Sequence, residues 1–565
     1  MTGPTRWVAA IATGAVLCLS ACTSTSPHVA GPTPSASSLP STPVASASAV
    51  AGSSSPPVSS SAAALSSSLL TSPVATPASL GPQPSGPPPV PTALPHIDPA
   101  TLQTYYTQKL VWKPCIGLYC TTLTVPIDYA HPSAGAIQLA VSRELTTRKP
   151  NLGEVVLNPG GPGASGVDFL KSAAGFVRES LGNEFDVVSF DPRGVGSSAP
   201  VRCLTAAQLD AWVAFEADPQ SPSAVAEQDQ LDKGFAAGCK AKTGALLAHV
   251  STVDTARDLD VLRAALGQTK LTYMGFSYGT FLGAIYAQLF PQNVRALVLD
   301  GAIDPAASAV ELDQVQAQGF EVALKAWIAH CVASTTPVKC PLGTSTATAE
   351  QHLDAFLATL RSAPIDASNG RTLTLSLAVG GIAAALYSIL DWDQLTISLY
   401  GAMKGNGDGL LALSDQIDGR QSNGSYDNLI ESNTAINCVD RPSIGPIAAY
   451  AAAAVAGEKD GPTFGQYIGW GNVACADWPV APELAPGPIS PTGSPPIMVV
   501  GTLRDPATPY RWAQALAKEA KGPLLTYDGD GHTAFLQSQC VDAVVKTFLV
   551  SLTDPVPGTT CKDNS

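Results

Sequence analysis

Residues 271–287, LTYMGFSYGTFLGAIYA, constrain the fold more than any other part of the chain. A short β-type run leads into Gly275-Phe-Ser-Tyr-Gly279, and small residues with helical spacing follow, which predicts a strand, a tight turn and a helix. A side chain at Gly275 or Gly279 would collide with neighbouring backbone, and the turn would lift the Ser277 hydroxyl above the edge of a sheet. A serine placed in this way is typical of a nucleophile, and the N–H of Tyr278 would face it from the start of the helix.

On both sides of this turn, short apolar strands alternate with helix patterns, which predicts an α/β fold with a mainly parallel sheet. Strands are expected over residues 121–125, 137–143, 154–158, 185–190, 271–274, 295–300, 496–501 and 524–527. Residues 305–480 are instead Ala-rich and mostly helical in pattern. We therefore expect a helical lid inserted between two parts of the sheet domain, 98–304 and 481–565.

The N-terminal segment has the composition of an export signal followed by a tether. Arg6 precedes an apolar run that is too short to span a bilayer well, which predicts a signal peptide over 1–21. The run ends in Leu19-Ser-Ala-Cys22, which resembles the lipobox of bacterial lipoproteins and implies a lipid anchor on Cys22 at the outer face of the cell membrane. The alternative is an ordinary secretory signal that leaves Cys22 as a spare thiol. Residues 22–97 are rich in Ser, Pro, Ala and Thr, which predicts a disordered tether.

The chain has twelve cysteines, and their number also indicates export. Cys18 would leave with the signal peptide and Cys22 would carry lipid, so an even number remains, which predicts disulfides. The sequence alone does not determine their connectivity. Pairing between neighbours would give Cys115–Cys120, Cys203–Cys239, Cys331–Cys340, Cys438–Cys475 and Cys540–Cys561. No C-x-x-C pair is present, so we expect no metal site.

A serine nucleophile needs a base, and the base needs a carboxylate that orients it. His532 follows the last expected strand and has the placement of the base, whereas the other six histidines lie in the tether, before the sheet core, before a helix or in the lid. Asp505 follows the preceding strand and is the expected orienting acid. Asp300 also follows a strand and is the competing candidate, although it leads into the lid.

Two further loops that follow strands bear on this site. The glycine-rich loop 159–166 allows close backbone approach, and its position predicts that the N–H of Gly161 forms an oxyanion hole together with that of Tyr278. A plain turn is the alternative. In the loop 191–198, Asp191 and Arg193 could act in catalysis, but we expect them to form a structural ion pair that braces the glycine-rich loop.

Several of these segments together resemble the secreted tripeptidyl aminopeptidases of actinobacteria, which are α/β-hydrolases related to proline iminopeptidases and include cell-envelope lipoproteins. The resemblance extends from about Trp112 to Cys561 and rests on residues 158–166, 191–198, 275–280, 298–301, 435–440, 475–479 and 531–533. It implies the α/β-hydrolase fold, with Ser277 as nucleophile, His532 as base and then acid, and Asp505 as its orienter. It further implies an acyl-enzyme, with Gly161 and Tyr278 as oxyanion donors.

The expected function is the release of short peptides, tripeptides in the family that the chain resembles, from free N-termini. An envelope carboxylesterase or amidase that acts on small acyl substrates is the second hypothesis. A non-catalytic binding lipoprotein is the third, and the complete set of Ser277, Asp505 and His532 argues against it. An aminopeptidase must hold a free α-ammonium, and Asp440 is our candidate carboxylate, with a helix cap or a surface acid as the alternative.

Charge and motifs limit the partners. The formal net charge is −14 and no basic stretch is present, so we expect no nucleic-acid partner. The chain has no phosphate-binding loop with its lysine, so no cofactor is expected. The expected partners are a peptide or small acyl substrate and, through the lipid anchor, the membrane.

Overall fold

A ten-stranded sheet organises the fold, in the order β1-β2-β3-β5-β4-β6-β7-β10-β11-β12. The pairings from β1 to β5 are antiparallel and those from β5 to β12 are parallel, which confirms the predicted mainly parallel sheet. The strands are β1 (Lys113–Cys115), β2 (Leu118–Pro126), β3 (Ala136–Glu144), β4 (Glu154–Asn158), β5 (Asp186–Phe190), β6 (Leu271–Phe276), β7 (Val294–Asp300), β10 (Ile497–Arg504), β11 (Leu524–Asp530) and β12 (Thr560–Lys562).

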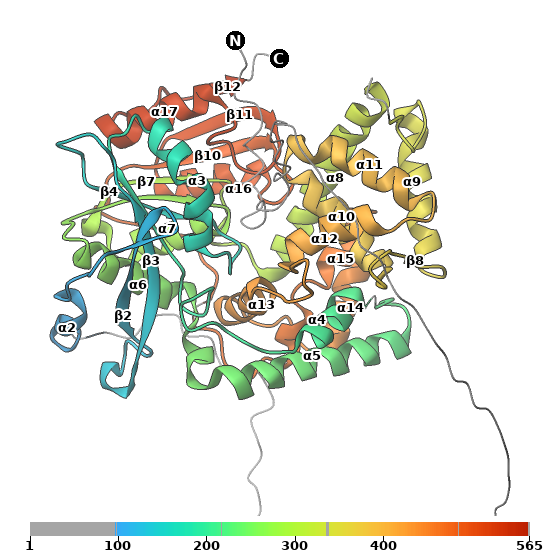
Figure 1. The fold of residues 1–565 in the computed structure, drawn as a ribbon, viewed down its shortest axis with the longest axis horizontal. Coiled ribbons are helices and arrows are strands. Elements are labelled where there is room, and N and C mark those ends of the chain that lie inside the picture. The colour runs from blue at the N-terminus through green and yellow to red at the C-terminus, as the bar shows by residue number, and fades with distance from the viewer. Residues whose placement is uncertain (1–96, 98, 216, 335–337, 484, 563–565) are drawn as a thin grey trace, which may run out of the picture. The chain divides into compact units, whose positions relative to one another are not determined.

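The computed structural model describes residues 97, 99–215, 217–334, 338–483 and 485–562 (Figure 1). The predicted signal peptide 1–21, the lipidation candidate Cys22 and the predicted tether up to residue 96 lie outside the described residues. Within the described part of the chain, no helix is both long enough and apolar enough to span a bilayer.

Helices cover both faces of the sheet. Because side chains alternate along a strand, β4 directs Val156 to one face and Val155 and Leu157 to the other, into two separate apolar clusters. The Val156 cluster includes residues of α6, α7 and α16, and the opposite cluster includes residues of α3 and α17 (Figure 1). The bounds are α3 (Gly166–Ser180), α6 (Thr252–Ala265), α7 (Tyr278–Leu289), α16 (Tyr510–Ala520) and α17 (Gln539–Ser551); a short α2 (Gln103–Tyr106) packs against α6.

The region 305–480 is mainly helical and has a core of its own, centred on the fully buried Trp327. Its elements are α8 (Ala309–Ala333), α9 (Thr346–Leu360), α10 (Leu375–Leu386), α11 (Trp392–Ala402), α12 (Asp408–Asp418), α13 (Leu429–Asp440), α14 (Ile447–Gly457), α15 (Gly465–Gly469) and the small hairpin β8 (Ile365–Asp366) and β9 (Thr372–Leu373).

Two helices from the first part of the chain, α4 (Ala206–Ala214) and α5 (Pro222–Thr243), also join this helical part. Ser376 of α10 donates to the carbonyl of Val213 (3.0 Å), and Arg420 donates to Asp210 of α4 (2.6 Å). The expected boundary at residue 304 assigns both helices to the sheet domain. The buried residues Leu209, Phe235 and Cys239 of these helices do lie in an apolar cluster of the sheet, so α4 and α5 contact both parts of the chain. The contacts with the helical part join residues far apart in sequence, which no local pattern records.

Five disulfides join cysteines that are neighbours along the chain, as the neighbour pairing predicts. The pairs are Cys115–Cys120, Cys203–Cys239, Cys331–Cys340, Cys438–Cys475 and Cys540–Cys561. Cys331–Cys340 and Cys438–Cys475 lie within the helical part, whereas Cys540–Cys561 links α17 to the edge strand β12. Each therefore closes a local loop.

The expected ion pair between Asp191 and Arg193 is wrong. Asp191 is buried, and its carboxylate accepts the Ser165 hydroxyl (2.6 Å) and the N–H groups of Val167 (3.0 Å) and Ser197 (2.8 Å). Asp191 therefore fixes the end of the glycine-rich loop, as expected, but through neutral donors at the start of α3.

Arg193 instead binds the helix that leads into β6. Its guanidinium is fully buried and donates to both oxygens of Asp258 in α6, from Nε at 2.7 Å and from Nη2 at 2.6 Å. The remaining N–H groups reach the carbonyls of Pro126, Ile127 and His249. Arg193 thus ties the loop after β5 to α6 and to the end of β2.

Arg193→Ala should destabilise the protein strongly, because it leaves the Asp258 carboxylate buried without its cation. We expect the free energy of unfolding to fall by about 3–5 kcal/mol, measured by urea denaturation. Arg148→Ala is the matched control, since it removes an exposed pair with Glu184 and should cost less than about 1 kcal/mol. Equal losses in the two variants would contradict this assignment.

Candidate active site

The turn between β6 and α7 holds Ser277 in a rare backbone conformation, with φ 55° and ψ −125°. A positive φ is costly for a residue other than glycine and persists only where the surroundings enforce it. Here the Ser277 N–H donates to the carbonyl of Asp300 (2.9 Å), and the Ser277 carbonyl accepts the Thr280 N–H (2.8 Å). The turn is therefore held from both β7 and α7.

The flanking glycines are required by space, as the sequence predicts. A Cβ at Gly275 would lie 2.2 Å from the carbonyl oxygen of Gly279, and a Cβ at Gly279 would lie 2.7 Å from that of Asn158. Both contacts are far below van der Waals distance and involve backbone that cannot move without breaking the sheet.

The glycine-rich loop after β4 lies against this turn, because β4 and β6 are neighbours in the sheet. A Cβ at Gly160 would come within 2.5 Å of the Phe276 carbonyl oxygen and 3.0 Å of the Tyr278 nitrogen. Among the described residues, neither the Gly161 N–H nor the Tyr278 N–H donates to a protein acceptor. The structure thus places two unused amide groups beside Ser277.

His532 and Asp505 meet at the ends of neighbouring parallel strands, β11 and β10. His532 Nδ1 lies 2.9 Å from Oδ1 and 3.1 Å from Oδ2 of Asp505. The Asp505 carboxylate also accepts N–H groups of Ala507 (3.0 Å), Thr508 (2.8 Å) and Thr533 (3.2 Å). These donors fix the carboxylate against the imidazole.

Asp300, the competing acid, does not reach the histidine nitrogen. Its carboxylate accepts the N–H groups of Ala534 and Phe535, the second at 2.8 Å, and so shapes the loop that carries His532. Complete burial raises the pKa of Asp300 to about 6, against the effect of these two backbone donors.

Two residues that support His532 did not emerge from the sequence. The Thr508 hydroxyl donates to Asp505 (3.0 Å) and lies 3.3 Å from His532 Nδ1. The Asp505-Pro-Ala-Thr508 turn is the local signal that could have indicated it. The backbone carbonyl of Tyr387 accepts the backbone N–H of His532 (2.8 Å), and the Tyr387 ring packs edge-on against the imidazole. Tyr387 comes from the helical part and leaves no such local signal.

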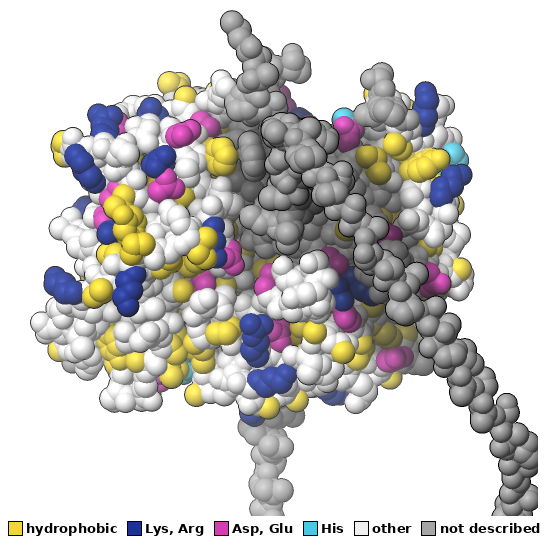
Figure 2. Space-filling model, in the orientation of Figure 1, with side chains coloured by type: hydrophobic (Ala, Val, Ile, Leu, Met, Phe, Trp, Pro, Cys, Tyr) yellow, Lys and Arg dark blue, Asp and Glu magenta, His cyan; other side chains and the backbone are white. Residues whose placement is uncertain are grey.

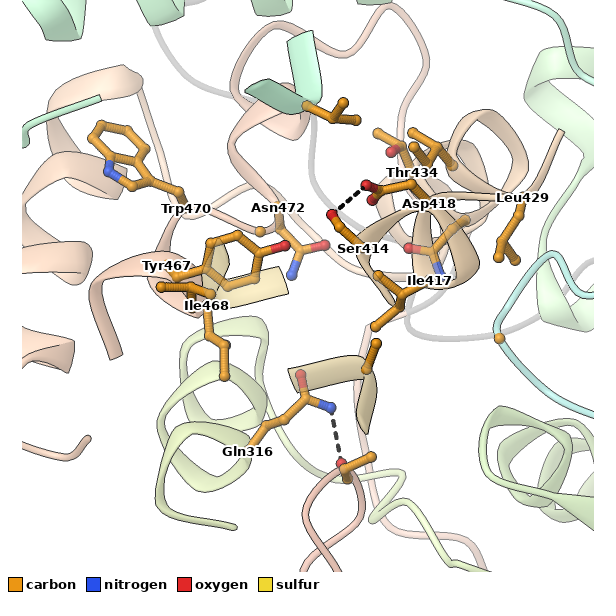
Figure 3. Close-up of a pocket in the computed structure, with 18 of the residues that line it drawn as sticks. Gln316, Ser414, Ile417, Asp418, Leu429, Thr434, Tyr467, Ile468, Trp470 and Asn472 are labelled. Atoms are coloured by element: carbon orange, nitrogen blue, oxygen red, sulfur yellow. Dashed lines mark hydrogen bonds between the residues drawn. The ribbon is translucent and has the colours of Figure 1, made fainter. Parts of the chain in front are cut away.

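Ser277 and His532 both line a cavity of about 750 Å³ between the sheet domain and the helical part. The helical part supplies much of the wall, including Ser414, Asp418, Tyr467 and Asn472, which surround the pocket in Figure 3. His532 Nε2 is buried and, among the residues that the structure describes, has no hydrogen-bond partner, Ser277 Oγ included. Contacts of this kind commonly tighten only when a substrate is bound.

Asp440, the expected amine-binding carboxylate, does not line this cavity. Its two oxygens accept the N–H (2.7 Å) and the hydroxyl (2.6 Å) of Thr252, the first residue of α6. The structure therefore supports the helix-capping alternative. Sequence reasoning selected Asp440 because it lies beside Cys438, but that disulfide does not direct its side chain into the cavity.

Other charges do face the cavity. Asp313 and Asp418 line it, and within the described part of the chain neither forms an ion pair. Burial raises the pKa of Asp313 to about 8 and that of Asp418 to about 7. In the described residues, no three His, Cys, Asp or Glu side chains are grouped as metal ligands. On the face drawn in Figure 2, basic and acidic side chains are interspersed.

Comparison with known proteins places this geometry in a family. The sequence profile described as alpha/beta hydrolase fold matches residues 154–539. Serine protease Hip1 of Mycobacterium tuberculosis is 38% identical over 480 residues, which cover 80% of this chain and 91% of that protein. Carboxylesterase B of the same organism is 37% identical, over 78% of this chain and 86% of that protein. Tripeptidyl aminopeptidase of Streptomyces lividans is 31% identical, over 80% and 86%.

These relatives are named for peptidase or esterase activity, and they align with most of the folded chain. The sheet, with its strained serine turn and its histidine loop, is the scaffold on which such hydrolases place their reacting groups. The chain is a serine hydrolase that belongs to the alpha/beta hydrolase family, in the actinobacterial serine peptidase group.

Proposed function

We propose that this protein is a cell-envelope aminopeptidase that releases short peptides, tripeptides in the first instance, from free N-termini. Ser277 is the nucleophile, His532 the general base and then acid, and Asp505 the residue that orients it. The Gly161 and Tyr278 N–H groups form the oxyanion hole.

The observation that carries the proposal is the charge of the cavity wall. Ser277 and His532 share the cavity with Asp313 and Asp418, which are half-buried acids without a described cationic partner. An unpaired buried carboxylate favours a bound cation, and the α-ammonium of a peptide is such a cation. A relative named tripeptidyl aminopeptidase supports the same assignment.

In the first half of the reaction, Ser277 Oγ attacks the scissile carbonyl while His532 Nε2 takes its proton. Asp505 holds the Nδ1–H of the imidazole, so that Nε2 is the nitrogen free to act. The carbonyl oxygen becomes an oxyanion, which the two amide groups stabilise at the N-terminal end of α7.

In the second half, the protonated His532 gives its proton to the departing amine, and the peptide bond breaks to leave an acyl group on Ser277. Water then enters, His532 removes its proton, and hydroxide attacks the acyl carbonyl. Collapse of the second tetrahedral intermediate returns the proton to Ser277 Oγ and releases the peptide acid.

Hydrolysis of small acyl esters is the second candidate. It is favoured by one observation, the 37% identity to a relative named carboxylesterase B. The chemistry at Ser277 would be the same, and the two functions differ in whether the cavity requires a free amine. We further propose export and attachment to the outer face of the cell membrane through Cys22, on the basis of its lipobox-like context.

A panel of three substrates tests the function with the full-length protein. We expect a tripeptide p-nitroanilide with a free amine to be hydrolysed with a kcat/KM about 100-fold above that of its N-acetylated twin, because acetylation removes the cation. A short-chain aryl ester is the third substrate, and Ser277→Ala is the control. Turnover of the ester alone would favour the esterase, and a Ser277→Ala variant as active as wild type would refute the mechanism.

Asp505→Asn should lower kcat about 10⁴-fold on every substrate, because an amide no longer favours the productive imidazole tautomer. Asp300→Asn keeps an oxygen acceptor for the loop and should lower kcat less than about tenfold. Steady-state kinetics of both variants test the assignment. A larger loss in Asp300→Asn would make Asp300 the orienting acid.

Cys22→Ala should move the protein from the membrane fraction to the soluble extracellular fraction, because it removes the thiol that would carry lipid. Fractionation of cells followed by immunoblotting measures the change. Cys18→Ala, in the apolar run, is the matched control and should leave the protein on the membrane. Retention of Cys22→Ala there would contradict the anchor.

A further inference from the structure

Arg441 is a buried cation that forms no salt bridge with a described carboxylate. It directly follows α13, its side chain is only 6% exposed, and it lines the cavity that contains Ser277. The guanidinium packs over the ring of Phe281, and among the described residues its Nε has no hydrogen-bond partner. Both carboxylate oxygens of the adjacent Asp440 accept hydrogen bonds from Thr252. A buried guanidinium in this state lacks an acceptor that a ligand can supply.

Asp313 is the complementary group on the same cavity. Among the described residues, only the Asn472 amide, at 3.2 Å, hydrogen-bonds to its carboxylate. Asp313 and Arg441 both line the cavity that contains Ser277. Desolvation raises the pKa of Asp313, whereas the positive charge of Arg441 lowers it. They are nevertheless not in contact as an ion pair. The cavity therefore presents a carboxyl group and a guanidinium that do not pair with each other, and a bound ammonium would lower the pKa of Asp313 and favour its carboxylate form.

Both charges lie close to the reacting groups. The Arg441 guanidinium lies 4.9 Å from the ring centroid of Phe281, which is one helical turn beyond Ser277 along α7. Asp313 lies on the same face of α8 as Gln316, whose amide donates to the Ala507 carbonyl (2.8 Å) beside Asp505 (Figure 3). An extended tripeptide spans about 10 Å. When its last carbonyl is at Ser277, its first residue can therefore lie near α7 and α8.

We propose that Asp313 and Arg441 together bind the N-terminal residue of the substrate. The Asp313 carboxylate accepts the α-ammonium, and the Arg441 guanidinium donates to the carbonyl oxygen of the same residue. This assignment rests on the proposed aminopeptidase function and names the residues that give it specificity.

The pairing fits the chemistry of a peptide N-terminus. Only the first residue of a chain carries an ammonium next to a carbonyl, so one carboxylate and one guanidinium facing a shared space recognise it. Asp418 is the other half-buried acid of the wall, but it accepts the Ser414 hydroxyl (3.0 Å), as Figure 3 shows. No unpartnered cation is described beside it. Asp418 therefore provides a matched control.

The test uses the full-length protein and two tripeptide p-nitroanilides, one with a free amine and one des-amino analogue that lacks only this group. Asp313→Asn should lower kcat/KM for the free-amine substrate about 100-fold and change that for the des-amino analogue less than threefold. Asp418→Asn should keep the preference for the free amine. Unchanged hydrolysis of a short-chain aryl ester and an unchanged melting temperature show that each variant is folded.

The outcomes separate the two proposals. If the wild-type protein does not distinguish the two peptides, the aminopeptidase function itself is wrong. If the wild-type protein prefers the free amine and Asp313→Asn keeps that preference, or Asp418→Asn loses it instead, only the assignment of the subsite is overturned.

Arg441→Met tests the second half of the subsite. Because the carbonyl is common to both peptides, kcat/KM should fall about tenfold on each of them, with the ester unaffected. Arg441→Lys, which keeps a donor and the charge, should recover part of the loss. Equal kinetics of Arg441→Met and wild type on both peptides would remove Arg441 from the proposal.

Discussion

The strained backbone of Ser277 is the constraint on which the rest of the site depends. A positive φ at a serine is maintained only because β6 and α7 are each packed on the sheet and cannot relax the turn between them. The same constraint requires glycine on both sides, at Gly275 and Gly279, and brings the loop after β4 into contact with the turn. The approach of the glycine-rich loop to the serine turn is therefore a consequence of strand packing.

Buried carboxylates organise the loops around this turn, each in a different way. Asp191 accepts hydrogen bonds from neutral donors at the start of α3, and Asp300 accepts two from N–H groups of the loop that carries His532. Asp258 forms an ion pair with the buried Arg193. Asp191 and Asp300 thereby satisfy backbone N–H groups that are buried away from water, whereas Asp258 accepts only side-chain donors, from Arg193 and Tyr129. Asp505 is the one of these acids that touches the imidazole, because its strand lies directly beside that of His532.

The helical part differs from the sheet domain in how its charged side chains are paired. Its own core is apolar, but the wall that it presents to the cavity carries Asp313, Asp418 and Arg441 without ion-pair partners among the described residues. Fold stability gives no reason to bury such charges, because each costs free energy unless something pairs with it. Under the proposed function, a charged ligand would pair with them, so that the helical part would set specificity while the sheet carries the reacting groups.

Residues whose role follows from local backbone geometry were predictable. Ser277 and its glycines are determined by a strand-turn-helix pattern, and Asp505 and His532 were found because the ends of parallel strands share one edge of a sheet. The pairing of Arg193 with Asp258, the capping role of Asp440 and the packing of α4 and α5 against the helical part were not predictable. The sequence by itself determined the fold class and the candidate reacting groups, because these depend on periodicity and turn chemistry over a few residues. Only the tertiary structure decided which charges are paired and which face the cavity, because that depends on distances between segments that are far apart in the chain.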